Sequence, residues 1–212
     1  MLKVNRIFYS IQGESTYAGL RCVFIRLTGC NLRCSYCDTQ YAWEEGETVS
    51  LDDIMRQVDD YECRLVEITG GEPLLQPASV QLADQLIKSG YQVLIETNGS
   101  MDIGQLPDGA IRIMDIKCPD SGEEKKNNWA NLDLLNPKDE IKFVISSLDD
   151  YRWAKYVIQK NVLSGFCTIH FAPAAGVLEP SHLAQWILED NLDVRFHLQM
   201  HKMIWPDEGQ ER

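Results

Sequence analysis

Short apolar runs alternate with helical patterns along most of this chain. Between several of the runs, apolar residues recur at the spacing of an amphipathic helix. Strands that alternate with helices imply a parallel sheet with right-handed crossovers, either doubly wound or curled into a partial barrel. Runs rich in Val, Ile, Phe or Leu predict strands over residues 4–9, 21–27, 64–69, 91–97, 110–117, 139–146, 166–172 and 193–199.

Four stretches between the strands are predicted to be helical. Ser50 precedes the first stretch and can cap its N-terminus, and Gly90 follows the second and can end it. The apolar faces of the four helices are Leu51, Ile54, Met55 and Val58; Val80, Ala83, Leu86 and Ile87; Tyr151, Ala154, Val157 and Ile158; and Leu183, Trp186 and Ile187.

Polar side chains accumulate at or just beyond the carboxyl ends of six predicted strands. In parallel α/β folds this edge of the sheet holds the active site. Any one of these residues could be a cap or a satisfied core group, but six strand ends together favour an enzyme. The residues are Arg26, Glu67, Thr69, Glu96, Thr97, Asn98, Asp115, Lys117, His170 and Gln199.

A polar loop over residues 28–39 carries Cys30, Cys34 and Cys37 at C-x3-C-x2-C spacing, with no fourth Cys or His at ligand spacing nearby. A structural zinc site normally closes with four protein ligands. A [4Fe–4S] cluster suits three cysteines, because its fourth iron can then take a ligand from outside the protein. The remaining cysteines, Cys22, Cys63, Cys118 and Cys167, fit small buried hydrophobes in or beside apolar runs.

Composition sets the outer bounds of the function. The 212 residues, of which 44% are hydrophobic, can bury one core, so a single domain over 1–212 is expected. No run approaches the roughly 20 apolar residues of a membrane span, and no signal segment is present. The seven cysteines indicate a reducing compartment, so we expect a cytoplasmic protein. The net charge of −12 argues against a nucleic-acid partner.

The cysteine spacing resembles the signature of the radical S-adenosylmethionine (radical SAM) enzymes. Gly70-Gly71-Glu72-Pro73 is similar to the element by which those enzymes hold the methionyl amino group. Glu96-Thr97-Asn98-Gly99 and Asp115-Ile116-Lys117 resemble the loops that line the methionyl, ribose and carboxylate pocket. The resemblance implies a set of residues that contact S-adenosylmethionine: Tyr36, Asp38, Gly71, Glu72, Glu96, Asn98, Asp115 and Lys117.

A narrower resemblance runs from the first strand almost to the C-terminus. Residues 8–15 (F-Y-S-I-Q-G-E-S), Phe24-Ile25-Arg26, Cys37-Asp38-Thr39 and residues 198–202 (L-Q-M-H-K) look like those of the 7-carboxy-7-deazaguanine synthases. That family implies an abbreviated barrel of mainly parallel strands with fewer helices than strands, usually dimeric. The implied reaction is a carbon–nitrogen lyase step in queuosine biosynthesis: 6-carboxy-5,6,7,8-tetrahydropterin becomes 7-carboxy-7-deazaguanine with loss of ammonia. The implied reductant is a flavodoxin or ferredoxin.

The same resemblance implies how the pterin and a magnesium ion are bound. Ile11, Gln12 and Gly13 would contact the flat pterin, and Arg26 has the fork geometry that suits its carboxylate. Mg2+ would share Thr39 with substrate oxygens and waters, although a Thr at this position could simply cap a turn. Further candidates are Thr69, which could place the reacting carbon, and Glu14 and His201, either of which could serve the acid–base step that expels ammonia.

Some features depart from the family pattern or leave alternatives open. Ser15 stands where many relatives have Gly, and a charged tail, 203–212, puts a contact by the C-terminal carboxylate in doubt. Residues 1–20 are expected to bind substrate, and the polar segment 118–138 to form a long mobile loop or lid. Two other functions remain possible from the residues alone: an activase for a glycyl-radical enzyme and a non-enzymatic zinc-binding interaction module.

Overall fold

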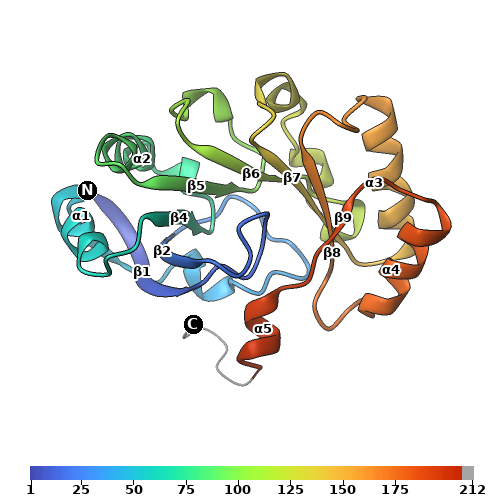
Figure 1. Ribbon diagram of the computed structural model, residues 1–212, viewed down its shortest axis with the longest axis horizontal. Coiled ribbons are helices and arrows are strands. Elements are labelled where there is room, and N and C mark those ends of the chain that lie inside the picture. Colours follow the sequence, from blue (N-terminus) through green and yellow to red (C-terminus); the bar gives the residue numbers. More distant parts are fainter. Residues whose placement is uncertain (207–212) are drawn as a thin grey trace.

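A computed structural model describes residues 1–206 of the chain. Within them, nine strands form one curved sheet in the order β3-β1-β2-β4-β5-β6-β7-β8-β9 (Figure 1). β1 (Leu2–Ile11) runs antiparallel to both β2 (Arg21–Leu27) and β3 (Glu47–Val49). Every other neighbouring pair is parallel. The sheet does not close, because β3 and β9 lie at opposite edges, so the predicted partial barrel is confirmed.

All eight predicted strands are present, but two details of the prediction are wrong. β3 was missed, because its three residues are too short to show an apolar run. The strand predicted over 193–199 is too long, since at this exposed sheet edge only Arg195 and Phe196 pair with β8. The other strands are β4 (Leu65–Gly70), β5 (Gln92–Thr97), β6 (Ile111–Asp115), β7 (Glu140–Ile145), β8 (Thr168–Pro173) and β9 (Arg195–Phe196).

The four predicted helices are confirmed. The Ser50 hydroxyl accepts a hydrogen bond from the Asp53 amide at 3.1 Å and so caps the first of them. Gly90 follows the second with a φ of +83°, a conformation that favours glycine and ends the helix. A fifth helix of five residues was not predicted, because one turn shows no periodicity. The helices are α1 (Leu51–Asp59), α2 (Ala78–Lys88), α3 (Leu148–Lys160), α4 (Pro180–Glu189) and α5 (Met200–Ile204).

The outer face of the sheet is apolar, and its concave face carries polar side chains. Along β4, Val66 and Ile68 are fully buried in the hydrophobic core, whereas Glu67 and Thr69 point into the concave interior of the sheet. α1 to α4 cover the outer face, and α5 lies apart from them (Figure 1). The concave interior therefore holds the polar residues that the strands deliver.

The segment 118–138 is folded against its neighbours. The fully buried Asn131 amide donates to the carbonyls of Gly99 at 3.1 Å and Met101 at 2.8 Å. Movement of this segment on ligand binding stays a prediction. It contains the 3-10 helices Pro119–Ser121, Glu124–Lys126 and Trp129–Leu134; the others lie at Gln40–Trp43, Pro73–Leu75 and Ile103–Gln105.

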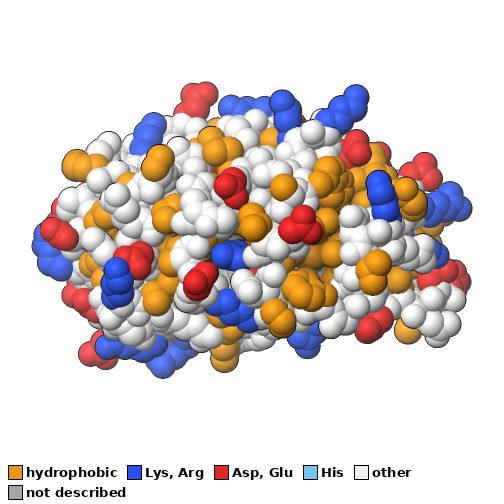
Figure 2. Space-filling model, turned by 90° about the horizontal axis from the view of Figure 1, so that it is seen from above, with side chains coloured by type: hydrophobic (Ala, Val, Ile, Leu, Met, Phe, Trp, Pro, Cys, Tyr) orange, Lys and Arg blue, Asp and Glu red, His pale blue; other side chains and the backbone are white. Residues whose placement is uncertain are grey.

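The surface carries no single-sign face in the view of Figure 2, where acidic and basic side chains are interspersed. Within residues 1–206, no helix combines the length and apolar composition needed to cross a membrane.

Candidate active site

Two cavities adjoin at the carboxyl edge of the sheet. The cysteine cavity, of about 230 Å³, is lined by the cysteine loop and the ends of β4 to β8. The substrate cavity, of about 500 Å³, is lined by β1, β2 and α5. The two share part of their walls and so form one cleft. The shared residues are Glu14, Arg26, Asp38, Thr39, Thr69, Glu96, His201 and Lys202.

The cysteine loop follows β2 and is held by backbone contacts. The Gly29 amide donates to the Ala42 carbonyl at 2.8 Å, and the Glu72 amide donates to the Gly29 carbonyl at 2.7 Å. Gly71 packs so closely that a Cβ there would lie 2.0 Å from the Gly29 oxygen and 2.8 Å from the Cβ of Cys30. Only glycine fits at this contact.

The three cysteines fit an iron–sulfur cluster. Cys30, Cys34 and Cys37 are free, partly buried and line the same cavity. No group of three or more His, Cys, Asp or Glu side chains in residues 1–206 converges on a position for one metal ion. A [4Fe–4S] cube instead needs one thiolate per corner iron around a shared space. Burial raises the pKa of Cys34 to about 11, so metal binding would have to displace the proton of this thiol.

Hydrogen-bond donors surround the first of these sulfurs. The Leu32 amide lies 3.4 Å from the Cys30 Sγ, and the Asn98 side-chain amide lies 3.7 Å from it. N–H groups aimed at a thiolate ligand stabilise its charge and tune the cluster that it binds.

Glu72 was predicted to contact the cofactor, but its side chain is fully buried behind Gly71. Its carboxylate accepts hydrogen bonds from the Leu74 amide at 3.0 Å, the Thr97 hydroxyl at 2.9 Å and the Asn98 amide at 2.7 Å. Glu72 thus ties the loop after β4 to the loop after β5. Gly71, rather than the Glu72 side chain, lies in the cavity wall.

Asp115 and Lys117 form a buried ion pair of 2.7 Å in the wall of the cysteine cavity. Among the described residues, the second Asp115 oxygen and the Tyr36 hydroxyl are buried without a hydrogen-bond partner. Burial raises the pKa of Tyr36, so its hydroxyl keeps its proton and can donate. Unsatisfied buried polar atoms beside a cavity fit the hydroxyls and carboxylate of a polar ligand such as S-adenosylmethionine.

Lys142, which sequence reasoning missed, lies between two predicted carboxylates. Its Nζ is 3.0 Å from Glu14 and also contacts Glu96, which accepts a hydrogen bond from the Thr69 hydroxyl at 3.0 Å. Burial raises the pKa of Glu14, but Lys142 and a hydrogen bond from Gln199 outweigh it and hold that pKa well below its usual range. Glu14 is therefore a carboxylate at neutral pH.

The substrate cavity has an apolar wall and a cationic end. The rings of Phe8 and Phe24 stack at 5.0 Å, and the Arg26 guanidinium lies 5.7 Å from the Phe8 centroid and 5.9 Å from that of Tyr41. Thr39, beside Arg26 in the same wall, donates to the Asp38 carboxylate at 2.9 Å. A flat ligand with a carboxylate matches this combination of apolar wall and positive charge.

Residues 11–13 end β1 and enter the same cavity. The Gln12 side-chain amide donates to the buried carboxyl group of Glu67, another residue missing from the predicted site. Burial, with Glu96 and Glu14 nearby, raises the pKa of Glu67 well above its usual range. The Gln12 side-chain oxygen accepts from the Glu14 amide at 2.9 Å, so Gln12 fixes both neighbours.

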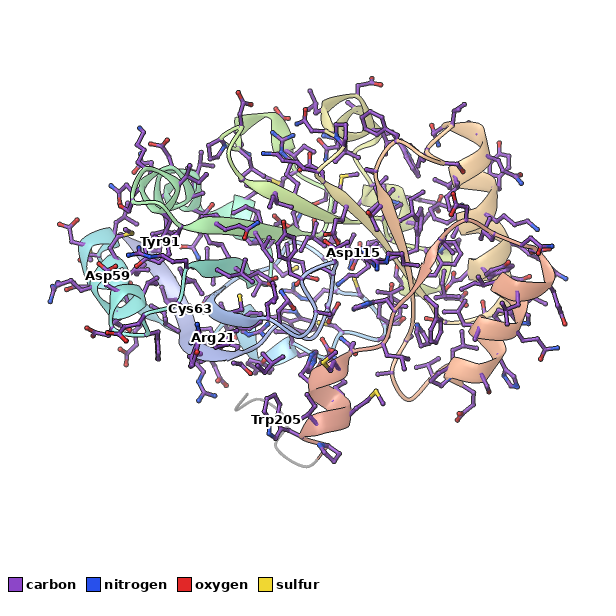
Figure 3. The ribbon with its side chains drawn as sticks, viewed as in Figure 1. Arg21, Asp59, Cys63, Tyr91, Asp115 and Trp205 are labelled. Carbon is purple, nitrogen blue, oxygen red and sulfur yellow. The ribbon has the colours of Figure 1, made fainter. Side chains whose placement is uncertain are left out.

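α5 closes the far side of the cleft against this segment. The Met200 amide donates to the Gly13 carbonyl at 3.0 Å, and Lys202 pairs with Asp38 at 2.6 Å. Burial lowers the pKa of His201, so its imidazole is neutral at pH 7. Trp205 lies beyond α5 (Figure 3) and completes the wall. The C-terminal carboxylate, whose contact with the substrate the charged tail puts in doubt, lies outside the described residues.

Comparison with known proteins decides the family. The model of the radical SAM superfamily matches residues 24–166. A protein of Koribacter versatilis called 7-carboxy-7-deazaguanine synthase is 43% identical over 98% of both chains. A protein of the same name from Chlorobaculum tepidum is 46% identical, over 97% of this chain and 96% of its own. The chain belongs to the 7-carboxy-7-deazaguanine synthase family.

A solved structure shares the fold of this synthase-family member. QueE from Escherichia coli, 23% identical, matches with a TM-score of 0.78 over 94% of each chain. Membership in the superfamily confirms the predicted radical SAM enzyme class and its cofactors, a [4Fe–4S] cluster and S-adenosylmethionine. The activase and zinc-module alternatives are not favoured.

The structure of this synthase-family member brings together nearly all the residues singled out in its sequence. Every predicted site residue except Glu72 lines one of the two cavities. The role of each residue stays a prediction. Lys142 was missed because a charged residue within a strand resembles an alternating surface position until its neighbours in the sheet are known. Glu67 was noted among the polar strand ends but was given no role in the site.

Proposed function

We propose that this chain converts 6-carboxy-5,6,7,8-tetrahydropterin to 7-carboxy-7-deazaguanine with loss of ammonia, on the route to queuosine. The observation that carries the proposal is the shared wall between the cysteine cavity and the substrate cavity. In a member of the 7-carboxy-7-deazaguanine synthase family, a radical formed beside the cysteines would then lie close to a pterin bound in the adjoining cavity.

The walls of the substrate cavity suit a carboxylated pterin. Phe8 and Phe24 can face the ring system, while the side-chain amide of Gln12 and the backbone of Ile11 and Gly13 supply hydrogen bonds. Arg26 can pair with the substrate carboxylate through its two-pronged guanidinium. Mg2+ would complete its coordination with that carboxylate, Thr39 and waters.

Cys30, Cys34 and Cys37 would hold the cluster, and Gly71, Glu96 and Asn98 with Tyr36, Asp38, Asp115 and Lys117 would hold S-adenosylmethionine. When bound and reduced, these cofactors supply a 5′-deoxyadenosyl radical able to take hydrogen from carbon. The protein orients the reactants and excludes water from the cleft. Thr69 and Glu96 lie where the two cavities meet, so they can set the distance between the cofactor and the pterin.

Two residues can act on the substrate after hydrogen abstraction, one by moving a proton and the other by holding charge. The neutral imidazole of His201 can accept a proton from the substrate. Glu14 is kept as a carboxylate by Lys142, so it can hold a cationic or N–H group of the substrate. The imidazolium formed on His201 could return that proton to the leaving nitrogen, which would depart as ammonia while Glu14 stays a carboxylate.

The remaining partners follow from the family. A flavodoxin or ferredoxin would supply the electron, the chain would work as a homodimer, and it would act in the cytoplasm on a small molecule, without a nucleic-acid or membrane partner.

An anaerobic assay of the cluster-reconstituted protein tests the proposal. Reductant, S-adenosylmethionine, Mg2+ and 6-carboxytetrahydropterin are supplied, and the deazaguanine product is followed by mass. Product should vanish without S-adenosylmethionine or the cluster, and its formation should need a higher pterin concentration without Mg2+. Cleavage of S-adenosylmethionine to 5′-deoxyadenosine with no deazapurine would overturn the substrate and keep the radical chemistry. About one zinc per chain, without iron or sulfide, would overturn both.

A further inference from the structure

Residues 12–20 join β1 to β2 as a hairpin. Two backbone bonds close its base: the Gln12 amide donates to the Leu20 carbonyl, and the Gly19 amide to the Gln12 carbonyl, each at 2.8 Å. Its tip, Ser15-Thr16, reaches the start of β7. The hairpin therefore links two strands at one side of the sheet to a strand far along it.

The contact at the tip is made with a buried carboxylate, that of Glu140. The Thr16 amide donates to both Glu140 oxygens, at 3.2 and 3.1 Å, and the Thr16 hydroxyl donates to one of them. Thr16 itself is exposed, whereas Glu140 is only 1% exposed. Substitution of Thr16 can therefore remove the hydroxyl part of the contact without opening the core.

His170, on β8, holds the Glu140 carboxylate from the other side. Its Nε2 lies 2.7 Å from the carboxylate, and the ring of His197 meets the His170 ring edge-on at 5.4 Å. Burial raises the pKa of Glu140, but the adjacent His170 imidazole and the hydrogen bonds from Thr16 outweigh it and lower that pKa. Glu140 is thus ionised and can accept the hydrogen bonds of Thr16. No step of the proposed chemistry uses this carboxylate.

The backbone at the tip needs an anchor. Ser15 has a φ of +65°, which costs a residue other than glycine about 1 kcal/mol or more. The Ser15 hydroxyl accepts from the Tyr17 amide at 3.2 Å, which offsets part of that cost. The hydrogen bonds of Thr16 to the charged Glu140 are stronger than neutral ones, and they offset the remaining cost of the Ser15 conformation.

The base of the hairpin carries Gln12 and Glu14 into the substrate cavity. Gln12 meets Glu67, and Glu14 meets Lys142, so both side chains depend on where the hairpin lies. We propose that Glu140, held by His170, is a positioning residue that anchors the hairpin at Thr16 and thereby sets the affinity for the pterin. This inference rests on the proposed function. The anchor should control the affinity for the pterin and should leave the cleavage of S-adenosylmethionine unchanged.

Thr16→Val removes the hydroxyl bond of the anchor and leaves the two amide bonds, whereas Glu140→Gln removes the charge that all three bonds share. Thr16→Ser keeps the hydroxyl donor. Tyr91→Phe is the control, because it removes a hydrogen bond to Asp59 on α1, in a part of the molecule away from Asp115 (Figure 3). Binding is measured by the fluorescence of 6-carboxypterin, an oxidised analogue, and the hairpin by hydrogen exchange of residues 12–20. Uncoupled 5′-deoxyadenosine formation is followed without pterin.

Thr16→Val and Glu140→Gln should weaken 6-carboxypterin binding about 10-fold, the worth of a charged hydrogen bond, and speed exchange in the hairpin. Thr16→Ser and Tyr91→Phe should bind like the wild type, and 5′-deoxyadenosine formation should be unchanged in all four. Wild-type affinity in Thr16→Val and Glu140→Gln, or an equal loss of 5′-deoxyadenosine formation, would overturn the inference. A wild type that neither binds nor converts a pterin would instead overturn the proposed function, and hairpin exchange would still decide whether Glu140 is the anchor.

Discussion

The Glu14 carboxylate lies 3.0 Å from the ammonium of Lys142, on the wall that the two cavities share. Lys142 also contacts Glu96, so one buried cation balances carboxylates from the substrate segment and from the end of β5. Attraction between charges in such an interior offsets their desolvation only when the geometry is good. Lys142 therefore compensates the charge of both carboxylates.

Lys142→Met should leave Glu14 and Glu96 without a cation and destabilise the protein by about 3–5 kcal/mol at pH 7. In the wild type the pKa of Glu14 is depressed, so its stabilising contribution is present above its ordinary value of 4.5 and lost only as pH falls through the lowered folded value. In the variant, protonation relieves the unpaired carboxylates. The difference in unfolding free energy should therefore shrink between pH 7 and pH 4.5, as measured by urea denaturation.

A matched control for that experiment is Lys155→Met, which breaks a partly exposed pair with Asp190. Pairs of that kind contribute little to stability, because water and salt screen them. A stability gap for Lys142→Met that is as small as the control's, or that stays constant with pH, would contradict the buried charge balance.

Gly71→Ala should disturb the cysteine loop directly. The added Cβ would lie 2.0 Å from the Gly29 oxygen, and because the clash involves backbone, the loop has to shift. Overpacking of this kind costs about 1–3 kcal/mol. Iron and sulfide bound per chain after anaerobic reconstitution should fall well below the wild-type amount.

Gly90→Ala is the control for the glycine substitution. Gly90 has a φ of +83° with open space around it, so alanine there brings backbone strain of about 1 kcal/mol without a clash. Cluster loading should stay at the wild-type level in this variant. Equal loading in Gly71→Ala and wild type would show that the contact with Gly29 does not shape the cluster loop.

The sequence predicted the fold where apolar runs are long. Val66 and Ile68 in β4 belong to such a run, and each run became a strand. β3 and α5 are short, and they form because neighbours hold them: β3 pairs with β1, and the first amide of α5 bonds to Gly13. Contacts of that kind are tertiary, and no local sequence pattern predicts them.

The candidate site was predictable to the extent that strand ends meet at one edge. Asp115 and Glu96 were placed there correctly, since parallel neighbours end together. Lys142 could be recognised as a site residue only once the register of β7 was known. That register pairs Lys142 with Asp115 on β6 and with His170 on β8. The Glu72 carboxylate is held away from the cavity by hydrogen bonds from Thr97 and the Asn98 amide, which are contacts between two loops that no sequence pattern specifies.

Cys34→Ala and Cys63→Ala separate the cluster ligands from the structural cysteines. Cys34 lines the cysteine cavity, whereas the buried Cys63 thiol donates to the Arg21 carbonyl at 3.2 Å, away from Asp115 (Figure 3). Loss of one of three thiolates leaves a corner iron of the cluster without its ligand. Cys34→Ala should therefore lose the cluster's visible absorbance, its iron and all product, while keeping a wild-type content of secondary structure by circular dichroism.

Cys63→Ala should keep the cluster and the activity. Deleting one buried sulfur leaves a small cavity and one unpaired carbonyl, so the expected cost is about 1–2 kcal/mol of stability. Iron content, 5′-deoxyadenosine formation and the urea midpoint are measured on both variants prepared side by side. If the two variants keep equal activity, or if Cys63→Ala loses iron as fully as Cys34→Ala, the assignment of Cys30, Cys34 and Cys37 as the cluster ligands is wrong.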